Sequence, residues 1–170
     1  MRIEFLDNID YKNDAILISG LDSADYSGRQ ILSIDSDNEI RFYEIKYEYH
    51  CSPFKSAELI NNILLVGFEE YFYMFDTINN KNLLSLKLFG YFGYFYQNDT
   101  LIYVADASGI HCINIEGSIQ WRNDELGLDG VIINKFDNKS IYGTGEWDPP
   151  GGWIDFILDK QTGEKIKNNR

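Results

Sequence analysis

The sequence predicts an all-β fold made of four blade-like repeats of about forty residues. A short apolar run that ends in a small residue occurs four times, and each copy is followed by a second apolar run that ends in Asp or Asn. The first runs are 17–20, 64–67, 102–105 and 142–145, and the second runs are 32–35, 73–76, 111–114 and 156–159. This period is typical of blade arrays. The 12 Tyr and 11 Phe residues also favour pleated, half-buried sheets.

Strand signals follow one another within each repeat. In the second repeat they predict strands over 63–67, 71–75, 83–88 and 91–96. In the third repeat the predicted strands are 101–105, 110–114, 118–122 and 130–134. The segments 56–62 and 124–127 would each form at most one helical turn, since neither has the length or apolar period of a stable helix.

The repeats predict a single domain over 1–170 and a way to close it. They cover 13–50, 61–96, 99–134 and 138–167. The fourth repeat ends after its third strand, and the apolar segment Ile3–Leu6 precedes the first repeat. We therefore expect residues 3–6 to pair with the last repeat and to close a small four-bladed propeller, because closure removes two exposed sheet edges. The alternative is a twisted β-sandwich in which the period is only strand spacing.

Two motifs carry a resemblance to known repeats. Residues 159–164 (Asp-Lys-Gln-Thr-Gly-Glu) and 114–121 (Asn-Ile-Glu-Gly-Ser-Ile-Gln-Trp) each place a polar turn with Gly after an apolar run, and an apolar residue follows. This pattern resembles the blades of quinoprotein-type and tryptophan–aspartate-type β-propellers, and Trp121 stands where quinoprotein-type blades often carry an outer Trp. The chain has only four copies, and we transfer no quinone or metal ligand from those families.

The net charge of −12 excludes several kinds of partner. Phosphate binding needs clustered Lys and Arg, so the charge argues against nucleic acid, and it argues equally against an anionic membrane surface. It favours a basic protein partner. The first residues lack the apolar stretch of a signal peptide, and no run is long enough to span a bilayer, which predicts a cytoplasmic protein.

The sequence predicts no metal site and no cofactor. His50-Cys51 and His111-Cys112 are suggestive pairs, but neighbouring residues of a strand point to opposite faces and offer one ligand per face. Residues 35–39 have oxygen ligands at alternate positions, as a calcium loop would, but they lack its central Gly. We interpret this segment as a solvated turn.

Insertions in the first and fourth repeats predict a binding patch. The segments 21–28 and 146–153 are longer than the corresponding hairpins of the inner repeats, and 149–150 is a stiffening Pro-Pro. In a closed ring the first and fourth repeats are neighbours, so both loops would share one rim. Loops on a rigid scaffold often bind partners. The expected partner-binding residues are Asp22, Asp25, Tyr26, Glu146, Trp147, Asp148 and Trp153.

These features favour a binding protein over an enzyme. In size, charge and design the chain resembles bacterial toxin-immunity proteins, which implies that it inhibits a cognate basic toxin, such as a nuclease, by covering the active site. The alternative is a carbohydrate or small-molecule binding protein, or a hydrolase, that uses a central pocket. Its carboxylates would then have to form a glycosidase pair with a fixed separation.

Overall fold

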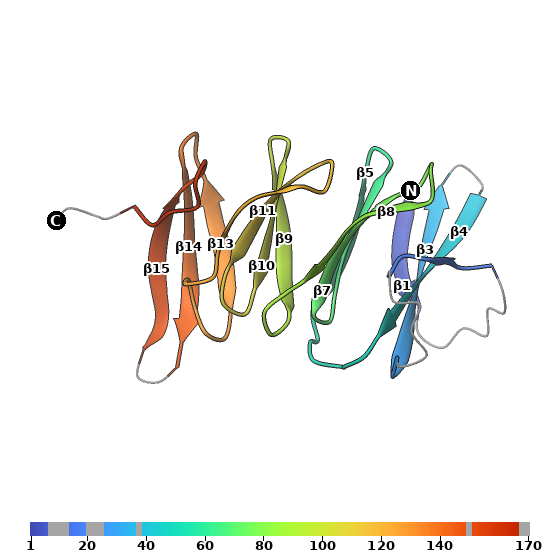
Figure 1. The fold of residues 1–170 in the computed structure, drawn as a ribbon, viewed down its shortest axis with the longest axis horizontal. Helices are drawn as coiled ribbons and strands as arrows, with labels where there is room; N and C mark the ends of the chain where they lie inside the picture. Colours follow the sequence, from blue (N-terminus) through green and yellow to red (C-terminus); the bar gives the residue numbers. More distant parts are fainter. Residues whose placement is uncertain (7–13, 20–25, 37–38, 149–150, 167–170) are drawn as a thin grey trace.

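The structure is a computed structural model that describes residues 1–6, 14–19, 26–36, 39–148 and 151–166. Its regular elements are β-strands in four sheets that stand in one row (Figure 1). The first sheet contains β1 (Arg2–Leu6), β2 (Ile16–Leu17), β3 (Gly28–Ser36) and β4 (Glu39–Tyr47). The second contains β5 (Lys55–Ile60), β6 (Ile63–Phe68), β7 (Tyr71–Asp76) and β8 (Lys81–Lys87). The third contains β9 (Phe92–Asn98), β10 (Leu101–Asp106), β11 (Ile110–Asn114) and β12 (Ile119–Asn123), and the fourth β13 (Val131–Phe136), β14 (Ser140–Trp147) and β15 (Gly152–Asp159). Within these described residues, no helix has the length and apolar character needed to cross a bilayer.

The all-β prediction is confirmed, and the cores explain why apolar runs recur. The last three sheets are antiparallel meanders in chain order. Each sheet packs on the next through its central strands, and three apolar cores fill the spaces between them. Tyr43 and Phe75, for example, meet edge to face across the first core with ring centroids 5.8 Å apart. In the second and third sheets the central strands have both faces in contact with neighbouring sheets, so they are continuous apolar runs rather than alternating ones.

The sheets are offset from the sequence repeats. The predicted fourth strands of the second and third repeats form β9 and β13, and each is the first strand of the following sheet. The strand β5 covers most of 56–62, where the sequence suggested at most a helical turn. Its residues Ala57 and Leu59 pack against the first core, so tertiary burial stabilises a strand that local propensity does not favour.

The N-terminal strand does not close a ring. β1 pairs antiparallel with β3, with Ile3 opposite Ile34, rather than with the last sheet. Its side chains add to the core between the first and second sheets, where the Phe5 ring stacks on the Phe68 ring at 6.2 Å between centroids. The first and last sheets stand at opposite ends of the row (Figure 1). The expected pairing of residues 3–6 with the last repeat is therefore wrong.

The first repeat also differs from the hairpin that the sequence suggested. The run 17–20 begins in β2, which pairs parallel with β4 at the outer side of the first sheet, with Ile16 opposite Tyr43. β3, which contains the second run, lies on the other side of β4. The connection between the two runs therefore crosses from one side of β4 to the other, and it is not an insertion in a hairpin.

In the second, third and fourth repeats, the Asp or Asn that ends the second run begins a turn. The Oδ1 atom of Asp76 accepts the N–H groups of Ile78 (2.9 Å) and Asn79 (3.0 Å), and Asp159 accepts those of Gln161 (2.8 Å) and Thr162 (2.9 Å). These bonds replace backbone partners that the turn lacks. The two motifs with propeller resemblance also contact each other, because the Trp121 indole N–H donates to the Lys160 carbonyl (3.1 Å).

Candidate functional site

One edge of the row gathers the connections between sheets. It contains the links that lead from one sheet to the next and the turns between the two central strands of the later sheets, along the lower side of Figure 1. We name this set of connections the junction edge. Its segments are 48–54, 69–70, 88–91, 107–109, 124–130 and 148–151, and residues 149–150 lie outside the described residues.

Backbone hydrogen bonds join the segments from 69–70 to 124–130 into a continuous strip that reaches Glu146 near the end of β14. The Phe92 N–H, at the end of one link, donates to the Glu69 carbonyl (2.6 Å). The Gly130 N–H donates to the Ala107 carbonyl (2.8 Å), and the Leu128 N–H donates to the Glu146 carbonyl (2.7 Å). Each link is thus tied to the turn beside it. A strip held in this way presents its side chains in a fixed arrangement, which lowers the ordering cost of binding.

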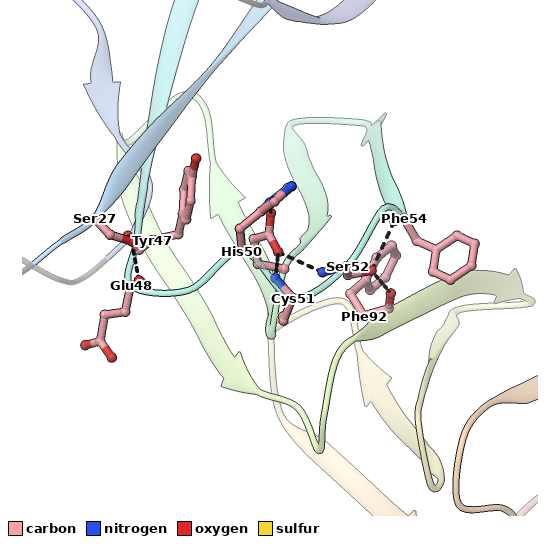
Figure 2. Close-up of polar contacts among 9 residues, drawn as sticks. Ser27, Tyr47, Glu48, His50, Cys51, Ser52, Phe54 and Phe92 are labelled. Atoms are coloured by element: carbon pink, nitrogen blue, oxygen red, sulfur yellow. Dashed lines mark hydrogen bonds and ion pairs between the residues drawn. The ribbon is translucent and has the colours of Figure 1, made fainter.

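A buried carboxylate, Glu69, fixes the first link. Its Oε2 atom accepts the N–H groups of Cys51 (2.6 Å) and Ser52 (3.0 Å), and its Oε1 atom lies 2.6 Å from Nδ1 of His50. Figure 2 shows His50, Cys51 and Ser52 following one another along this link. Burial by itself would raise the pKa of Glu69, but the hydrogen bonds from Cys51, Ser52 and His50 outweigh it and hold the pKa below its usual value.

A second buried carboxylate, Asp106, fixes the next link. It accepts the N–H groups of Phe89 (3.1 Å), Ser108 (2.9 Å) and Gly109 (2.8 Å), and its Oδ2 atom lies 2.9 Å from Nε2 of His111. Burial favours a higher pKa here too, but the bonds from His111, Ser108 and Phe89 lower the pKa of Asp106. The two histidines therefore each pair with a buried carboxylate that holds a junction.

The cysteines next to these histidines are poor nucleophiles. Burial and the nearby Glu69 carboxylate raise the pKa of the Cys51 thiol to about 11, and burial raises the pKa of Cys112 to about 11 as well. Both remain thiols at neutral pH, whereas the thiolate is the reactive form. In the part of the chain that the structure describes, no three His, Cys, Asp or Glu side chains are grouped to hold a metal ion.

The junction edge exposes large apolar side chains at intervals. Phe89 is 66% exposed and Tyr49 is 63% exposed, although both lie in short links. Phe54 is exposed as well, and its ring lies 6.1 Å from that of Tyr91, whose hydroxyl donates to the Asp129 carbonyl (2.5 Å). Leu128 continues the series in the last link. These residues form an exposed apolar series beside carboxylates.

Only part of the loop patch predicted from the sequence comes together. Asp22 and Asp25 lie outside the described residues. Tyr26 precedes β3 in the first sheet, and Nζ of Lys46 lies over its ring at 5.0 Å. The remaining four residues, Glu146, Trp147, Asp148 and Trp153, stand together where β14 turns into β15, with Glu146 opposite Trp153. Because the row is open, Tyr26 and Trp147 belong to sheets at opposite ends (Figure 1).

The sequence analysis missed the two anchoring carboxylates, although a signal for them exists. An acidic residue follows the first apolar run within two positions in all four repeats, as Asp22, Glu69, Asp106 and Glu146. Asp22 lies outside the described residues. Glu69 and Asp106 each fix a link through the carboxylate, whereas Glu146 accepts the Leu128 N–H through its backbone carbonyl.

A cavity between the third and fourth sheets bears on the small-molecule alternative. It has a volume of about 640 Å³ and lies at the other edge of the row, beside Trp121 and Lys160. Asp159 is the one carboxylate in its described lining. Glycoside hydrolysis uses two carboxyl groups across the scissile bond, so this cavity does not match that arrangement.

Comparisons with known proteins do not assign a family. No protein-family model matches the chain, and no curated protein matches it. Among solved structures, one similar chain is described as "AfRom2 CNH domain", with a TM-score of 0.39 and 14% sequence identity. The match covers 60% of this chain and 32% of that one.

We predict that the Glu69 carboxylate makes the fold sensitive to acid. The pKa of Glu69 is lower in the folded chain than in the unfolded chain, where an ordinary Glu titrates near pH ~4.3. Its contribution to stability is thus present above that pH and is lost as the pH falls through the folded pKa. Circular dichroism melting between about pH 7 and pH 3 should show a smaller acid-induced loss for Glu69→Gln than for the wild type.

The matched control for this prediction is Glu116→Gln, at an exposed glutamate on the other edge of the row. It should melt as the wild type does at every pH. A Glu69→Gln variant whose melting temperature falls with acid as steeply as that of the wild type would show that this carboxylate does not carry the effect.

Proposed function

We propose that the chain is a protein-binding protein and that its junction edge docks a basic partner. The observation that carries this proposal is the one-sided charge of the edge. Its described connections contain neither Lys nor Arg, and besides the buried Glu69 they carry six carboxylates: Glu48, Glu70, Asp124, Glu125, Asp129 and Asp148. A surface of one sign steers a partner of the opposite sign during encounter.

The other edge of the row provides the contrast. Its described connections mix four carboxylates with Lys139 and Lys160. One of these, Lys160, is paired with Asp99 at 2.8 Å. The opposite edge therefore has no strong preference for the charge of a partner. The acidic residues of the described connections are concentrated on the junction edge.

The exposed apolar residues give the edge a means of holding a partner. Aromatic side chains in the centre of an interface commonly provide most of the binding energy, and Tyr49, Phe54 and Phe89 already extend from fixed links. Three lysines outside these connections lie near the edge. Nζ of Lys55 lies 5.1 Å from the Phe5 ring centre, and Nζ of Lys87 lies 3.1 Å from Glu70. Nζ of Lys165 donates to the Glu125 carbonyl and lies 5.9 Å from the Trp147 ring centre. Steering by the carboxylates and anchoring by these rings are separate functions.

The partner class that we propose is a toxin with a cationic active-site surface, such as a nuclease. Carboxylates on a rigid edge would take the place of the substrate phosphates, and the apolar residues would exclude water around them. The chain would then act by covering an active site and would need no chemistry of its own. In this proposal the sheets serve as propeller-type blades that hold the edge in line.

The proposal predicts that charge on this edge governs the rate of association. Glu125→Lys with Asp129→Lys should slow association with the basic partner captured from the native cell, and the effect should shrink as salt screens the charges. Phe89→Ala should instead speed dissociation, because an anchoring side chain contributes about 2 kcal/mol or more. Surface plasmon resonance at low and at physiological ionic strength measures both rates.

The matched control is Glu116→Lys with Glu164→Lys, which changes the net charge equally but lies on the opposite edge. It should alter association much less than the pair on the junction edge. If the two pairs of substitutions had equal effects, the overall charge of the chain, and not the charge of the junction edge, would set the association rate. A captured partner that is itself acidic would contradict the proposal.

A further inference from the structure

Among the residues that the structure describes, the fourth sheet has one strand fewer than each of the other three. The first three sheets have four strands each, whereas the fourth consists of β13, β14 and β15. Lys165 and Ile166 begin the fourth position: Lys165 forms a bridge with Leu158, and the Ile166 N–H donates to the Ile157 carbonyl (2.8 Å). Beyond these residues the described chain provides no partner for the rest of the β15 edge.

The backbone of β15 shows which groups remain available. The peptide groups of Ile157 and Asp159 point to this edge, since they bond to Ile166 and Glu164. Peptide groups alternate in direction along a strand, so those of Trp153 and Asp155 point the same way. Within the described residues, neither has a hydrogen-bond partner there. The edge therefore offers two N–H groups and two carbonyls to an extended segment.

The free part of this edge lacks the usual protection against strand pairing. Natural edge strands are often protected by Lys, Pro or bulges. The edge strands β8 and β12 carry Lys81, Lys87 and Arg122, but residues 152–157 contain no Lys, Arg or Pro. Trp153 and Ile154 are each about half exposed on opposite faces of this strand.

A groove lies along the same edge. It has a volume of about 430 Å³. Its lining combines apolar side chains, among them Leu126, Trp147, Ile154, Phe156 and Ile166, with the polar or charged Asn134, Tyr142, Asp155 and Lys165. In the other sheets the outermost strand covers the corresponding side chains of the core, as β8 does for the second core through Leu84 and Leu86. A fourth strand would thus place its inward side chains in a groove that is apolar around Ile154 and Phe156 and polar around Asn134 and Lys165.

We propose that the β15 edge takes up an extended, basic segment of a partner protein as the fourth strand of the last sheet. Main-chain bonds to Trp153 and Asp155 would give affinity, and pockets for alternate side chains would give specificity. Apolar residues of the segment would enter the groove, and a Lys or Arg on the other face would lie beside Asp155. This site is separate from the junction edge, although both favour basic partners.

Charge decides against a second copy of this chain as the occupant. Each copy carries −12, and antiparallel pairing of two β15 edges would bring the carboxylates around Asp148 and Asp155 of both copies close together. Like charges of this kind oppose association. A cationic segment gains from the same carboxylates, so the observations favour the partner strand.

The test uses a short peptide of alternating valine and lysine, with the full chain labelled for NMR. Before addition of peptide, the Trp153 and Asp155 amides should exchange with solvent faster than those of Ile154 and Phe156, which face β14. The peptide should slow exchange at residues 153 and 155 and shift signals along β15. Asp155→Lys should weaken peptide binding about tenfold, because it replaces an attraction by a repulsion.

Two controls separate this proposal from other occupants and from the proposed function. Glu116→Lys, far from β15, should leave the affinity for the peptide unchanged, and a peptide with N-methylated amides on its bonding side should not bind. Binding that appears only after deletion of residues 167–170, or a dimer in place of a peptide complex, would overturn the proposal. Because the probe is synthetic, failure here leaves the test of the junction edge unaffected.

Discussion

Replacing Asp106 by alanine should destabilise the chain by about 3–5 kcal/mol, as expected when one partner of a buried, charged network is removed. Asp106 is 1% exposed and accepts hydrogen bonds from Phe89, Ser108 and Gly109 while it also contacts His111. Without the carboxylate, three backbone N–H groups and a buried imidazole lose their acceptor at once. Such a loss is a large share of the roughly 5–15 kcal/mol that stabilises a typical domain.

Urea unfolding measured by tryptophan fluorescence and by circular dichroism checks this result. Asp106→Asn should fall between the wild type and Asp106→Ala, because an amide retains one acceptor oxygen but presents an NH₂ group to donors. Asp124→Ala is the control, since Asp124 is an exposed residue on the same edge that pairs only with Arg122. Its effect should stay within about 0.5 kcal/mol. If Asp106→Ala were as stable as this control, the Asp106 carboxylate would not contribute to the stability of the fold.

Gly145→Ala should be the second severe substitution, because β14 and the last link approach each other too closely for a side chain. A Cβ atom placed on Gly145 would lie 1.7 Å from the Leu126 carbonyl oxygen and 2.6 Å from its carbon. These are backbone atoms that cannot rotate away, and the Leu126 N–H is itself bound to the Ser108 carbonyl (2.9 Å). The third and fourth sheets would have to separate locally, at a cost of about 3 kcal/mol.

Gly152→Ala is the informative comparison for this prediction. Gly152 has a positive φ of 61°, but no atom lies within 4 Å of the position of a Cβ. Its substitution should therefore cost only the conformational strain, about 1 kcal/mol. Urea unfolding gives both values, and amide exchange should locate the damage of Gly145→Ala at residues 124–130. Equal costs for the two glycines would show that the close approach at Leu126 is easily relieved.

The parts of the fold that could be predicted from sequence are those with strong local patterns. The runs that became β6, β7, β10 and β11 lie between packed sheets, so burial on both faces made them continuous and easy to recognise. β5 was missed because Lys-Ser-Ala-Glu has no strand preference, and only packing against the first core makes it a strand. The pairing of β1 with β3 could not be inferred from the sequence. It depends on the core into which the side chains of Ile3 and Phe5 pack, and this is a tertiary contact.

The candidate site shows a similar division. Loop length in the sequence pointed to residues around Tyr26 and Trp147, whereas the junction edge is built from links between sheets and from turns within them. Link residues such as Phe54 and Phe89 do not follow the repeat, so nothing in the periodicity identified them. Their exposure becomes visible only once Glu69 and Asp106 fix the links in space.

The crossover in the first sheet has a consequence for the order of folding. In the last three sheets every strand pairs with a neighbour in the chain, so these contacts form over short loops. The first sheet needs residue 3 to find residue 34 and residue 16 to find residue 43, which closes longer loops before any contact is gained. Sequence-distant pairing is slow. We therefore expect the later sheets to assemble first and to act as the template on which the first sheet condenses.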